Sequence, residues 1–359
     1  MNEDLLQRIH SWPALGGLAT ATPAHFLKQD EAAARAGDIF GPEFPDFEAL
    51  RPVFVNSGIE KRHLAMPVEW YLEPRDWSQR TDAYLTVATE LFVRAAREAL
   101  DKAQVTAEEV DAVVTVSSTG IATPSLEARA AADLGLRSDI LRVPVFGLGC
   151  AGGVSGLALA SRLASGEQGL TVLVVVVELC SIAFRSDKPT KANIVATALF
   201  GDGAAAAVIG PRRKEAQYTV GPGTQHMWPD TLGIMGWNVD PNGFEVVFDR
   251  AIPPFARRHM RGAIEGFRER LSIEPGEVAR YLFHPGGEKV LQAIEAAMEF
   301  EPASLAHERD ILRDFGNMSA PTALFVLERA LQSGEAGLSL LTALGPGFTA
   351  SCIPIGRAW

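Results

Sequence analysis

Cysteine is scarce in this chain of 359 residues, which has only Cys150, Cys180 and Cys352. Three cysteines cannot build a disulfide framework, and such a small, odd number fits a reducing cytosol. A secretory leader is not expected either. The first twelve residues, MNEDLLQRIHSW, are acidic and amphipathic and lack both a basic start and a long apolar stretch. We therefore expect a cytoplasmic protein.

Long hydrophobic runs and an excess of positive charge are also absent. The longest apolar stretch, Leu170 to Val177, contains Thr171 and is far shorter than the roughly 20 residues that cross a bilayer. No membrane span is expected. There are 33 Lys and Arg residues against 44 Asp and Glu, a net charge of −11, so the chain offers no basic surface to a nucleic acid.

What remains is an ordinary globular composition, 47% hydrophobic and 21% charged, with strand and helix patterns that alternate. This alternation predicts an α/β protein. Strands are expected at 14–20, 112–118, 170–179, 204–209, 281–284, 338–344 and 350–355. Helices are expected at 82–103, 151–164, 255–271, 287–299 and 319–331. The stretch 211–243, rich in Gly, Pro, Trp and Asn, is expected to be a join with an elaborated loop.

One segment of the chain occurs twice. Residues 163–173 read LASGEQGLTVL and residues 331–341 read LQSGEAGLSLL, identical at seven of eleven positions. Gly149-Cys150 and Gly316-Asn317 each precede a helical stretch, and the distance between these two pairs along the chain is nearly the same as the distance between the repeated segments. Such spaced echoes indicate two fused copies of one α/β unit. We divide the chain into residues 1–212, which carry Cys150, and residues 213–359, which carry Asn317.

Cys150 lies between an extended run and a Gly/Ala-rich helix, in Gly149-Cys150-Ala151-Gly152-Gly153. A thiol at a helix N-terminus is favoured as thiolate by the helix dipole and the free N–H groups. The residues alone leave a nucleophile and a small packing residue equally open.

His284 and Asn317 complete a possible constellation with Cys150. His284 ends a short apolar strand before Pro285, in a position typical of functional groups in open α/β sheets. Taken alone, each residue also has a plain alternative: a polar loop histidine, and a helix N-cap for Asn317. Cys, His and Asn together are a set used in acyl transfer.

Five blocks carry a resemblance to a known family. They are Gly149 to Gly153, Leu199 to Ala206, His284 to Gly287, Gly316 to Ser319 and Gly345-Pro346-Gly347. In order and spacing they resemble the type III polyketide synthases, the chalcone synthase-like branch of the thiolase superfamily. The resemblance implies a thiolase-like fold, in which two duplicated halves form a five-layered α-β-α-β-α sandwich. The segment from Lys191 to Phe200 also looks like bacterial alkylpyrone and alkylresorcinol synthases.

The resemblance implies a condensing reaction on acyl-CoA and malonyl-CoA, with no cofactor or metal. Cys150 would take the acyl starter, His284 would hold it as thiolate, and His284 and Asn317 would bind the thioester carbonyl oxygen. Decarboxylation of the malonyl thioester, Claisen extension and ring closure would follow. A neutral amide and a histidine N–H suit an oxygen that gains negative charge.

Further residues are assigned by the same resemblance. Phe200 would separate the CoA channel from the growing chain, and the loop Gly345-Pro346-Gly347 would shape the cyclisation cavity. Small pocket residues suggest a roomy acyl tunnel and fatty acyl starters. Thr123 would reach into the partner's cavity in a homodimer. The expected pocket residues are Ser118, Cys180, Ala183 and Val246; a plain packing role for Cys180 stays open.

Contacts to CoA are less well matched, because Pro52 and Asn56 replace two cations of the plant enzymes. Candidate substitutes are Arg51, Lys61, Arg62 and Lys289, and each is also explained as an ordinary surface charge. An acyl carrier protein therefore stays open as the starter donor.

The sequence is also compared with three other functions that a chain of this kind could have. A ketoacyl-ACP synthase III-like enzyme would perform one condensation without ring closure. A tetrahydroxynaphthalene synthase-like enzyme would start from malonyl-CoA, and such enzymes also carry a cysteine at the place of Cys180. A catalytically idle homologue would have no reason to retain Cys150, His284 and Asn317 together.

Overall fold

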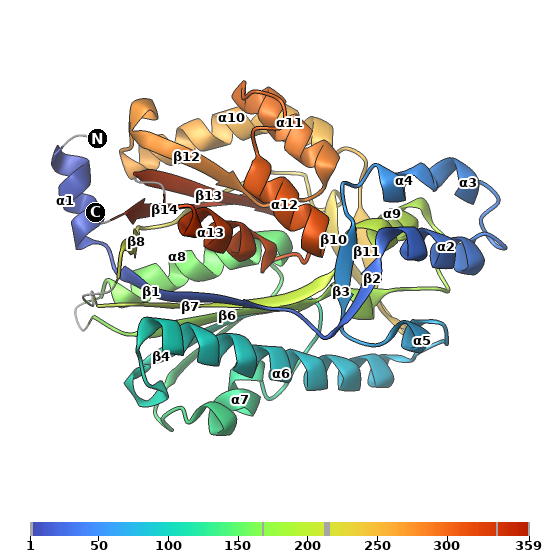
Figure 1. Cartoon of the computed structure of the whole chain (residues 1–359), viewed down its shortest axis with the longest axis horizontal. Helices are drawn as coiled ribbons and strands as arrows, with labels where there is room; N and C mark the ends of the chain where they lie inside the picture. Colours follow the sequence, from blue (N-terminus) through green and yellow to red (C-terminus); the bar gives the residue numbers. More distant parts are fainter. Residues whose placement is uncertain (1–2, 167–168, 212–215, 335–336, 358–359) are drawn as a thin grey trace.

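The computed structural model describes residues 3–166, 169–211, 216–334 and 337–357, and it is built from alternating layers of helix and sheet (Figure 1). The strand order is β1-β7-β6-β4-β5 in the first strand layer and β12-β13-β14 in the second. The short strand β8 pairs with both β1 and β14, so one hydrogen-bonded path joins the layers, and β9 pairs with β14. The strands are β1 (Ala14–Ala21), β4 (Ala112–Val116), β5 (Leu141–Val145), β6 (Val172–Leu179), β7 (Asp202–Gly210), β8 (Tyr218–Val220), β9 (Thr224–Met227), β12 (Val278–Phe283), β13 (Leu338–Gly345) and β14 (Thr349–Arg357).

Three layers of helices enclose these strands. α6 and α7 cover the outer face of the first strand layer, α10 and α11 cover the second, and α8 and α13 lie between them (Figure 1). This arrangement confirms the predicted five-layered sandwich of two duplicated halves. The helices are α6 (Trp77–Ala103), α7 (Leu126–Leu134), α8 (Gly152–Ala164), α10 (Ile252–Leu271), α11 (Glu288–Met298) and α13 (Thr322–Gln332).

The central strands are apolar because helices cover both of their faces. Every residue of β6, VLVVVVEL, is buried, as is every residue of β7, DGAAAAVIG. Such continuous apolar runs are typical of strands covered on both sides. The alanines of β7 leave room for α6, which packs on this strand.

The two halves place equivalent elements in equivalent positions. α8 and α13 contact each other in the central layer, and each follows one of the two proposed site residues, Cys150 or Asn317. The repeated segments run from these helices into β6 and β13. Residues 167–168 and 335–336 of the repeat, and the proposed boundary at 212/213, lie outside the described residues.

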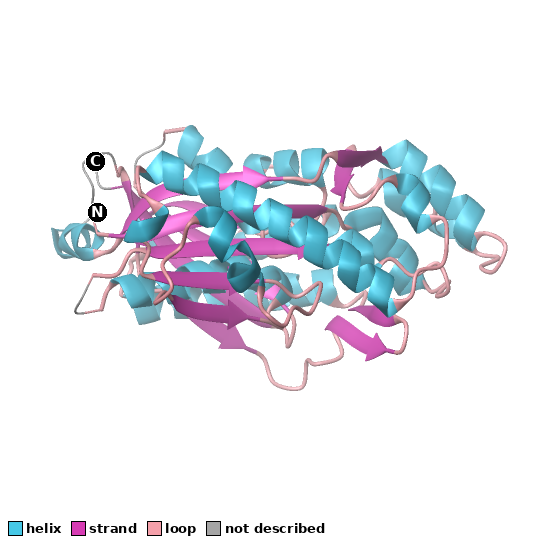
Figure 2. Ribbon diagram, turned by 90° about the horizontal axis from the view of Figure 1, so that it is seen from below, coloured by secondary structure: helices cyan, strands magenta, loops and turns pink. Residues whose placement is uncertain are grey.

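A further group of short elements lies at one end of the sandwich (Figures 1 and 2). Four of its five helices share an apolar cluster around Phe40 and Phe54. The prediction of a loop over 211–243 is wrong in part, because this stretch contains β8, β9 and β10. The elements at this end are β2 (His25–Lys28), α2 (Gln29–Phe40), α3 (Phe47–Leu50), α4 (Pro52–Val55), β3 (Lys61–Leu64), α5 (Val68–Tyr71), α9 (Lys191–Leu199), β10 (Met235–Asp240) and β11 (Gly243–Phe248).

Two helices remain, α1 (Glu3–Ser11) against α10 and α12 (Ala306–Phe315) beside α13. Among the described helices, none combines the length and the apolar content that crossing a bilayer requires.

Candidate active site

Cys150, His284 and Asn317 line one cavity, which we call the catalytic cavity. Cys150 lies in a single 3-10 turn directly before α8, His284 follows β12, and Asn317 precedes α13. Their exposed fractions are only 6%, 5% and 1%. The seam between the two halves therefore holds a thiol, an imidazole and a carboxamide in a space nearly closed to solvent.

Glycines allow the backbone around Cys150 to pack tightly. Gly149 has a φ of 46°, and a Cβ there would lie 2.6 Å from Pro346. A Cβ on Gly345 would lie 2.5 Å from the Leu148 carbonyl oxygen and 2.6 Å from the Ala151 Cβ. The loop Gly345-Pro346-Gly347 thus lies directly against the turn that carries the nucleophile.

Ser319 connects the thiol to the carboxamide. The Cys150 Sγ lies 3.6 Å from the Ser319 Oγ, and the Ser319 N–H donates to the Asn317 Oδ1 at 2.8 Å. The Asn317 Nδ2 donates to the Gly286 carbonyl oxygen at 3.3 Å. With Oδ1 accepting, the Asn317 amide nitrogen is directed as a donor. The role of Ser319 was not predicted from the sequence, although Ser319 lies within the motif Gly316 to Ser319.

Burial favours the neutral forms of the thiol and the imidazole. Loss of hydration raises the pKa of Cys150 to about 11 and lowers the pKa of His284 to about 3. Neither ring nitrogen of His284 has a hydrogen-bond partner in the described part of the chain. Desolvation opposes both charges of the predicted resting ion pair between Cys150 and His284, which stays a prediction.

The arrangement can support a proton transfer from the Cys150 thiol to the His284 imidazole. A neutral imidazole with a free nitrogen can accept the Cys150 proton as the sulfur attacks a thioester carbonyl. The imidazolium then donates to the oxygen that gains charge, beside the Asn317 amide.

Glu178, whose charge acts on Cys150, was not predicted from the sequence. It is fully buried near the end of β6, where its Oε2 accepts from the Ser118 N–H at 2.9 Å and the Thr119 hydroxyl at 2.8 Å. Burial raises its pKa to about 8, and its Oε1 has no partner among the described residues. A glutamate inside the run LVVVVEL was the signal that could have identified it. The Ser118 hydroxyl in turn accepts from the N–H groups of Gly147 and Gly149.

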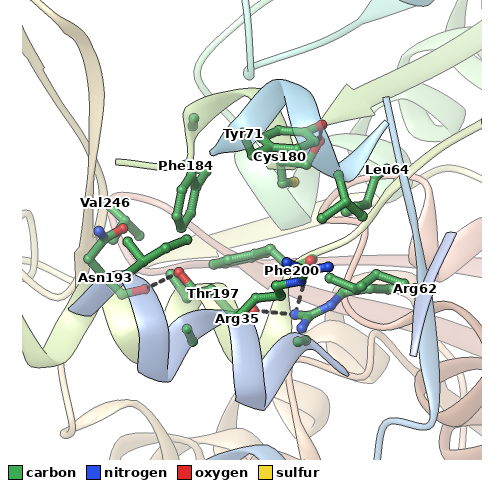
Figure 3. A pocket seen from close by; sticks show the side chains of 18 of the residues that line it. Arg35, Arg62, Leu64, Tyr71, Cys180, Phe184, Asn193, Thr197, Phe200 and Val246 are labelled. Atoms are coloured by element: carbon green, nitrogen blue, oxygen red, sulfur yellow. Dashed lines mark hydrogen bonds between the residues drawn. The ribbon is translucent and has the colours of Figure 1, made fainter. Parts of the chain in front are cut away.

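Phe200 lies between the catalytic cavity and a second one, which we call the outer cavity. Figure 3 shows residues that line the outer cavity. Phe200 lines both, and its ring meets the Phe248 ring edge-on at 6.1 Å. Cys180, Ala183 and Val246 line the outer cavity, whereas Cys150 does not. The remaining lining residues are Leu27, Ala32, Arg35, Ala36, Ile39, Arg62, Leu64, Val68, Tyr71, Leu72, Ser181, Phe184, Asn193, Ala196, Thr197 and Trp237.

Of the four predicted CoA contacts, Arg51, Lys61 and Lys289 are exposed. Arg51 forms a surface ion pair with Glu48. Arg62 is only 2% exposed, and its Nη1 donates to the Thr197 carbonyl oxygen. Its prediction as a CoA phosphate contact is corrected, because the guanidinium is turned into the protein.

Thr123 is exposed in the loop between β4 and α7, close to the exposed side chain of Ile121. In the described ranges of the chain, no group of three or more His, Cys, Asp or Glu side chains is placed to hold a metal ion.

Comparisons with known proteins cover nearly the whole chain. Residues 58–212 match the N-terminal domain and residues 220–355 the C-terminal domain of chalcone and stilbene synthases. A 1,3,6,8-tetrahydroxynaphthalene synthase of Streptomyces peucetius subsp. caesius is 37% identical over 347 residues, which cover 95% of this chain and 92% of the relative. A 3,5-dihydroxyphenylacetyl-CoA synthase of Amycolatopsis balhimycina is 28% identical, with 93% and 90% covered. The crystal structure of 1,3,6,8-tetrahydroxynaphthalene synthase from Streptomyces coelicolor A3(2) superposes with a TM-score of 0.90 at 25% identity, covering 96% of this chain and 99% of that one.

Proposed function

The chain belongs to the chalcone and stilbene synthase family and is a type III polyketide synthase, and we propose that it extends a fatty acyl starter with malonyl units and closes an alkylpyrone or alkylresorcinol ring. The observation that carries this proposal is the outer cavity. Most of its lining is aliphatic or aromatic, and it begins at Phe200, beside the catalytic cavity. A hydrocarbon tail gains free energy from such a lining, whereas a carboxylate loses hydration there.

The proposed reaction uses the three residues of the catalytic cavity in turn. The Cys150 sulfur attacks the starter thioester, His284 takes its proton, and the departing CoA sulfur receives that proton. Loss of carbon dioxide from the malonyl thioester then leaves an enolate, whose oxygen accepts from His284 and the Asn317 amide. The enolate carbon attacks the acyl carbonyl on Cys150, and the sulfur leaves with the electron pair of the broken thioester bond.

The proposal also covers the carrier group of the substrates and the cellular compartment of the protein. The starter and the extender are CoA thioesters, and no further cofactor takes part. The exposed cations Arg51, Lys61 and Lys289 are proposed to meet the CoA phosphates. Gly58 lies in the segment between Arg51 and Lys61 and packs against Glu288. Glu288 is the neighbour of Lys289, so the segment that carries Arg51 and Lys61 adjoins the segment that carries Lys289. Three free, buried cysteines fit a cytoplasmic protein.

We further propose that two copies of the chain form a homodimer. β5 is the edge strand of the first layer, and Phe146, which follows it, is 58% exposed. Ile121 is 53% exposed in the loop that carries Thr123. An apolar edge of this kind is expected to be covered by a partner, and the Thr123 loop would then border the partner's catalytic cavity.

A panel of starters tests the choice of substrate. The protein is incubated with malonyl-CoA and acyl-CoAs of increasing chain length, and products are identified by mass. We expect ring products that contain a long acyl tail and several malonyl-derived units. Cys150→Ala should abolish acyl loading, while Cys180→Ala should retain it, since only Cys150 lies in the catalytic cavity. Loss of loading in Cys180→Ala alone would contradict this assignment of the nucleophile.

A matched pair of variants on α2 tests the outer cavity. Ala36 is buried and lines this cavity, whereas Ala34, two residues earlier, is exposed. Ala36→Leu should shorten the longest starter that is extended, because the added carbons occupy the space of the tail. Ala34→Leu should leave the range unchanged. An unchanged range in Ala36→Leu would place the tail elsewhere.

The second candidate function is self-priming with malonyl-CoA, which the resemblance implies for a tetrahydroxynaphthalene synthase-like enzyme, the name that the 37% identical relative carries. Incubation with malonyl-CoA alone distinguishes the two. An aromatic product built only from malonyl-derived carbons, formed faster than any tailed product, would favour this candidate over a fatty acyl starter.

A further inference from the structure

Arg62 is a buried cation without a carboxylate partner. Its side chain, on β3, is 2% exposed, and no Asp or Glu within the described ranges lies within ion-pair distance of its guanidinium. Burial lowers its pKa to about 10, and the more distant Asp202 opposes this effect. Removing a guanidinium from water is costly, so strong local interactions must hold it there.

Those interactions are with the end of α9. The Arg62 Nη1 donates to the Thr197 carbonyl oxygen and lies 3.5 Å from the Phe200 carbonyl oxygen (Figure 3). The last carbonyls of a helix lack partners within the helix, and they carry the negative end of its dipole. A cation at this place both satisfies these carbonyls and complements the dipole. α9 ends at Leu199, directly before the residue that separates the two cavities.

The same segment holds Asn317 through its main chain. The Asn317 N–H donates to the Leu199 carbonyl oxygen at 2.9 Å, and the Gly201 N–H donates to the Asn317 carbonyl oxygen at 3.0 Å. Phe200 and Asn317 thereby form an isolated parallel bridge. Asn317 is thus fixed by the residues on either side of Phe200.

Packing around Arg62 leaves this segment little freedom. A Cβ on Gly201 would lie 3.1 Å from the Arg62 Cβ, and a Cβ on Gly316 would lie 3.3 Å from it. His63, the next residue along β3, stacks on Phe315 with ring centroids 6.0 Å apart. β3, the end of α9 and the Asn317 loop therefore pack as one unit.

We propose that Arg62 is a positioning residue for decarboxylation and condensation, which acts by fixing the end of α9 and, through it, the Phe200 ring and the Asn317 carboxamide. The proposal rests on the condensing activity of the family and not on the proposed fatty acyl starter. Arg62 lines the outer cavity and does not line the catalytic cavity, so it acts through other residues.

The test measures two quantities separately: the number of Cys150 thiols that can be acylated, which we call loadable sites, and the reaction rate at each acylated site. Acyl-Cys150 is measured by mass at completion with the best starter of the panel. Malonyl-CoA decarboxylation and chain extension are then measured per acylated site. A role in stability alone lowers the number of loadable sites, whereas a positioning role lowers the rate at each site.

Arg62→Met, which keeps the length of the side chain but removes its donors, should load Cys150 nearly to the wild-type extent. Its decarboxylation and extension rates per site should fall about 10²-fold, the size expected when a reacting group is displaced by about 1 Å. Arg62→Lys retains a charge and donors at the same carbonyls and should recover part of that loss. The control is Arg8→Met, because Arg8 also donates to two carbonyls at the end of a helix, those of Leu271 and Ser272, far from the site.

Unchanged rates per site in Arg62→Met would overturn the proposal. So would a loss of loadable sites at a normal rate per site, and so would failure of both Arg62 variants to fold while Arg8→Met folds, since Arg62 would then act only in stability. If the wild-type protein accepts only malonyl-CoA, the fatty acyl proposal fails, and the same measurements with malonyl-CoA still decide the role of Arg62.

Discussion

Cys150, His284 and Glu178 are ionisable, yet burial favours the neutral form of each. Their pKa values move to about 11, about 3 and about 8, and desolvation is the largest cause in each case. The sequence identifies Cys150 and His284 through their motifs, but it does not reveal their hydration. Desolvation therefore opposes the predicted resting ion pair, and the burial of Arg62, one of four plausible cations, could not be foreseen from the sequence.

Glu178→Gln should change how stability depends on pH. The folded pKa of Glu178 is about 8 and its ordinary value is 4.5, so the native state alone holds this proton between those values. Stability is full below pH 4.5 and is lost as pH rises toward 8, by up to about 1.4 kcal/mol per pH unit. Glutamine has no such proton. The Tm of the variant relative to that of the wild-type protein should therefore rise from pH 5 to pH 8. Scanning calorimetry measures it, with the exposed Glu43→Gln as control. An advantage that is constant with pH would contradict a raised pKa.

At the scale of helices and strands, what could be predicted depends on burial. The seven expected strands and five expected helices are present because each is either continuously apolar or periodic; β6 and α6 are examples. α6 begins at Trp77, earlier than predicted, because Asp76 and Gln79 form a capping box. The short strands β2, β3 and β8 to β11 were missed, because three to six partly exposed residues carry no clear period.

Two glycines should respond to alanine in opposite ways. Gly345, at the end of β13, packs on the turn that carries Cys150, whereas Gly262 is exposed within α10 and has open space where a Cβ would lie. Gly345→Ala should lower both Tm and the rate of Cys150 acylation, because the new methyl group forces the turn to move. Gly262→Ala should raise the free energy of unfolding by about 0.5–1 kcal/mol and leave acylation unchanged. Equal acylation rates in the two variants would show that the loop does not set the geometry of Cys150.

At the scale of the whole molecule, the repeat in the sequence predicted two fused α/β units with Cys150 and Asn317 at matching places, and the family resemblance implied the layered architecture. Equivalent helices, α8 and α13, come together in the central layer, so the residues before them converge. The outer cavity could not be predicted in the same way. It is lined by segments as distant as Leu27 and Val246, and only three-dimensional packing brings those together.

Phe146→Asp tests the proposed dimer. We expect the wild-type protein to scatter light as a particle of twice the 38.5 kDa of one chain. A carboxylate on the edge beside β5 should shift the population toward the single chain, since burying it without a partner is unfavourable. Polyketide formation should fall with it if the Thr123 loop completes the partner's cavity. Val55→Asp, on the exposed side of α4, is the control. A single-chain mass for the unmodified protein would exclude the dimer.

The placement of the thiol before α8 and of the carboxamide before α13 has a consequence for the ancestry of this architecture. Two identical chains related by a symmetry axis must present the same side chain at both positions, so any substitution appears on both sides at once. Joining the copies into one polypeptide lifts that restriction. One position could then specialise in bond making while the other specialised in holding charge, a division of labour that separate, identical halves could not have evolved.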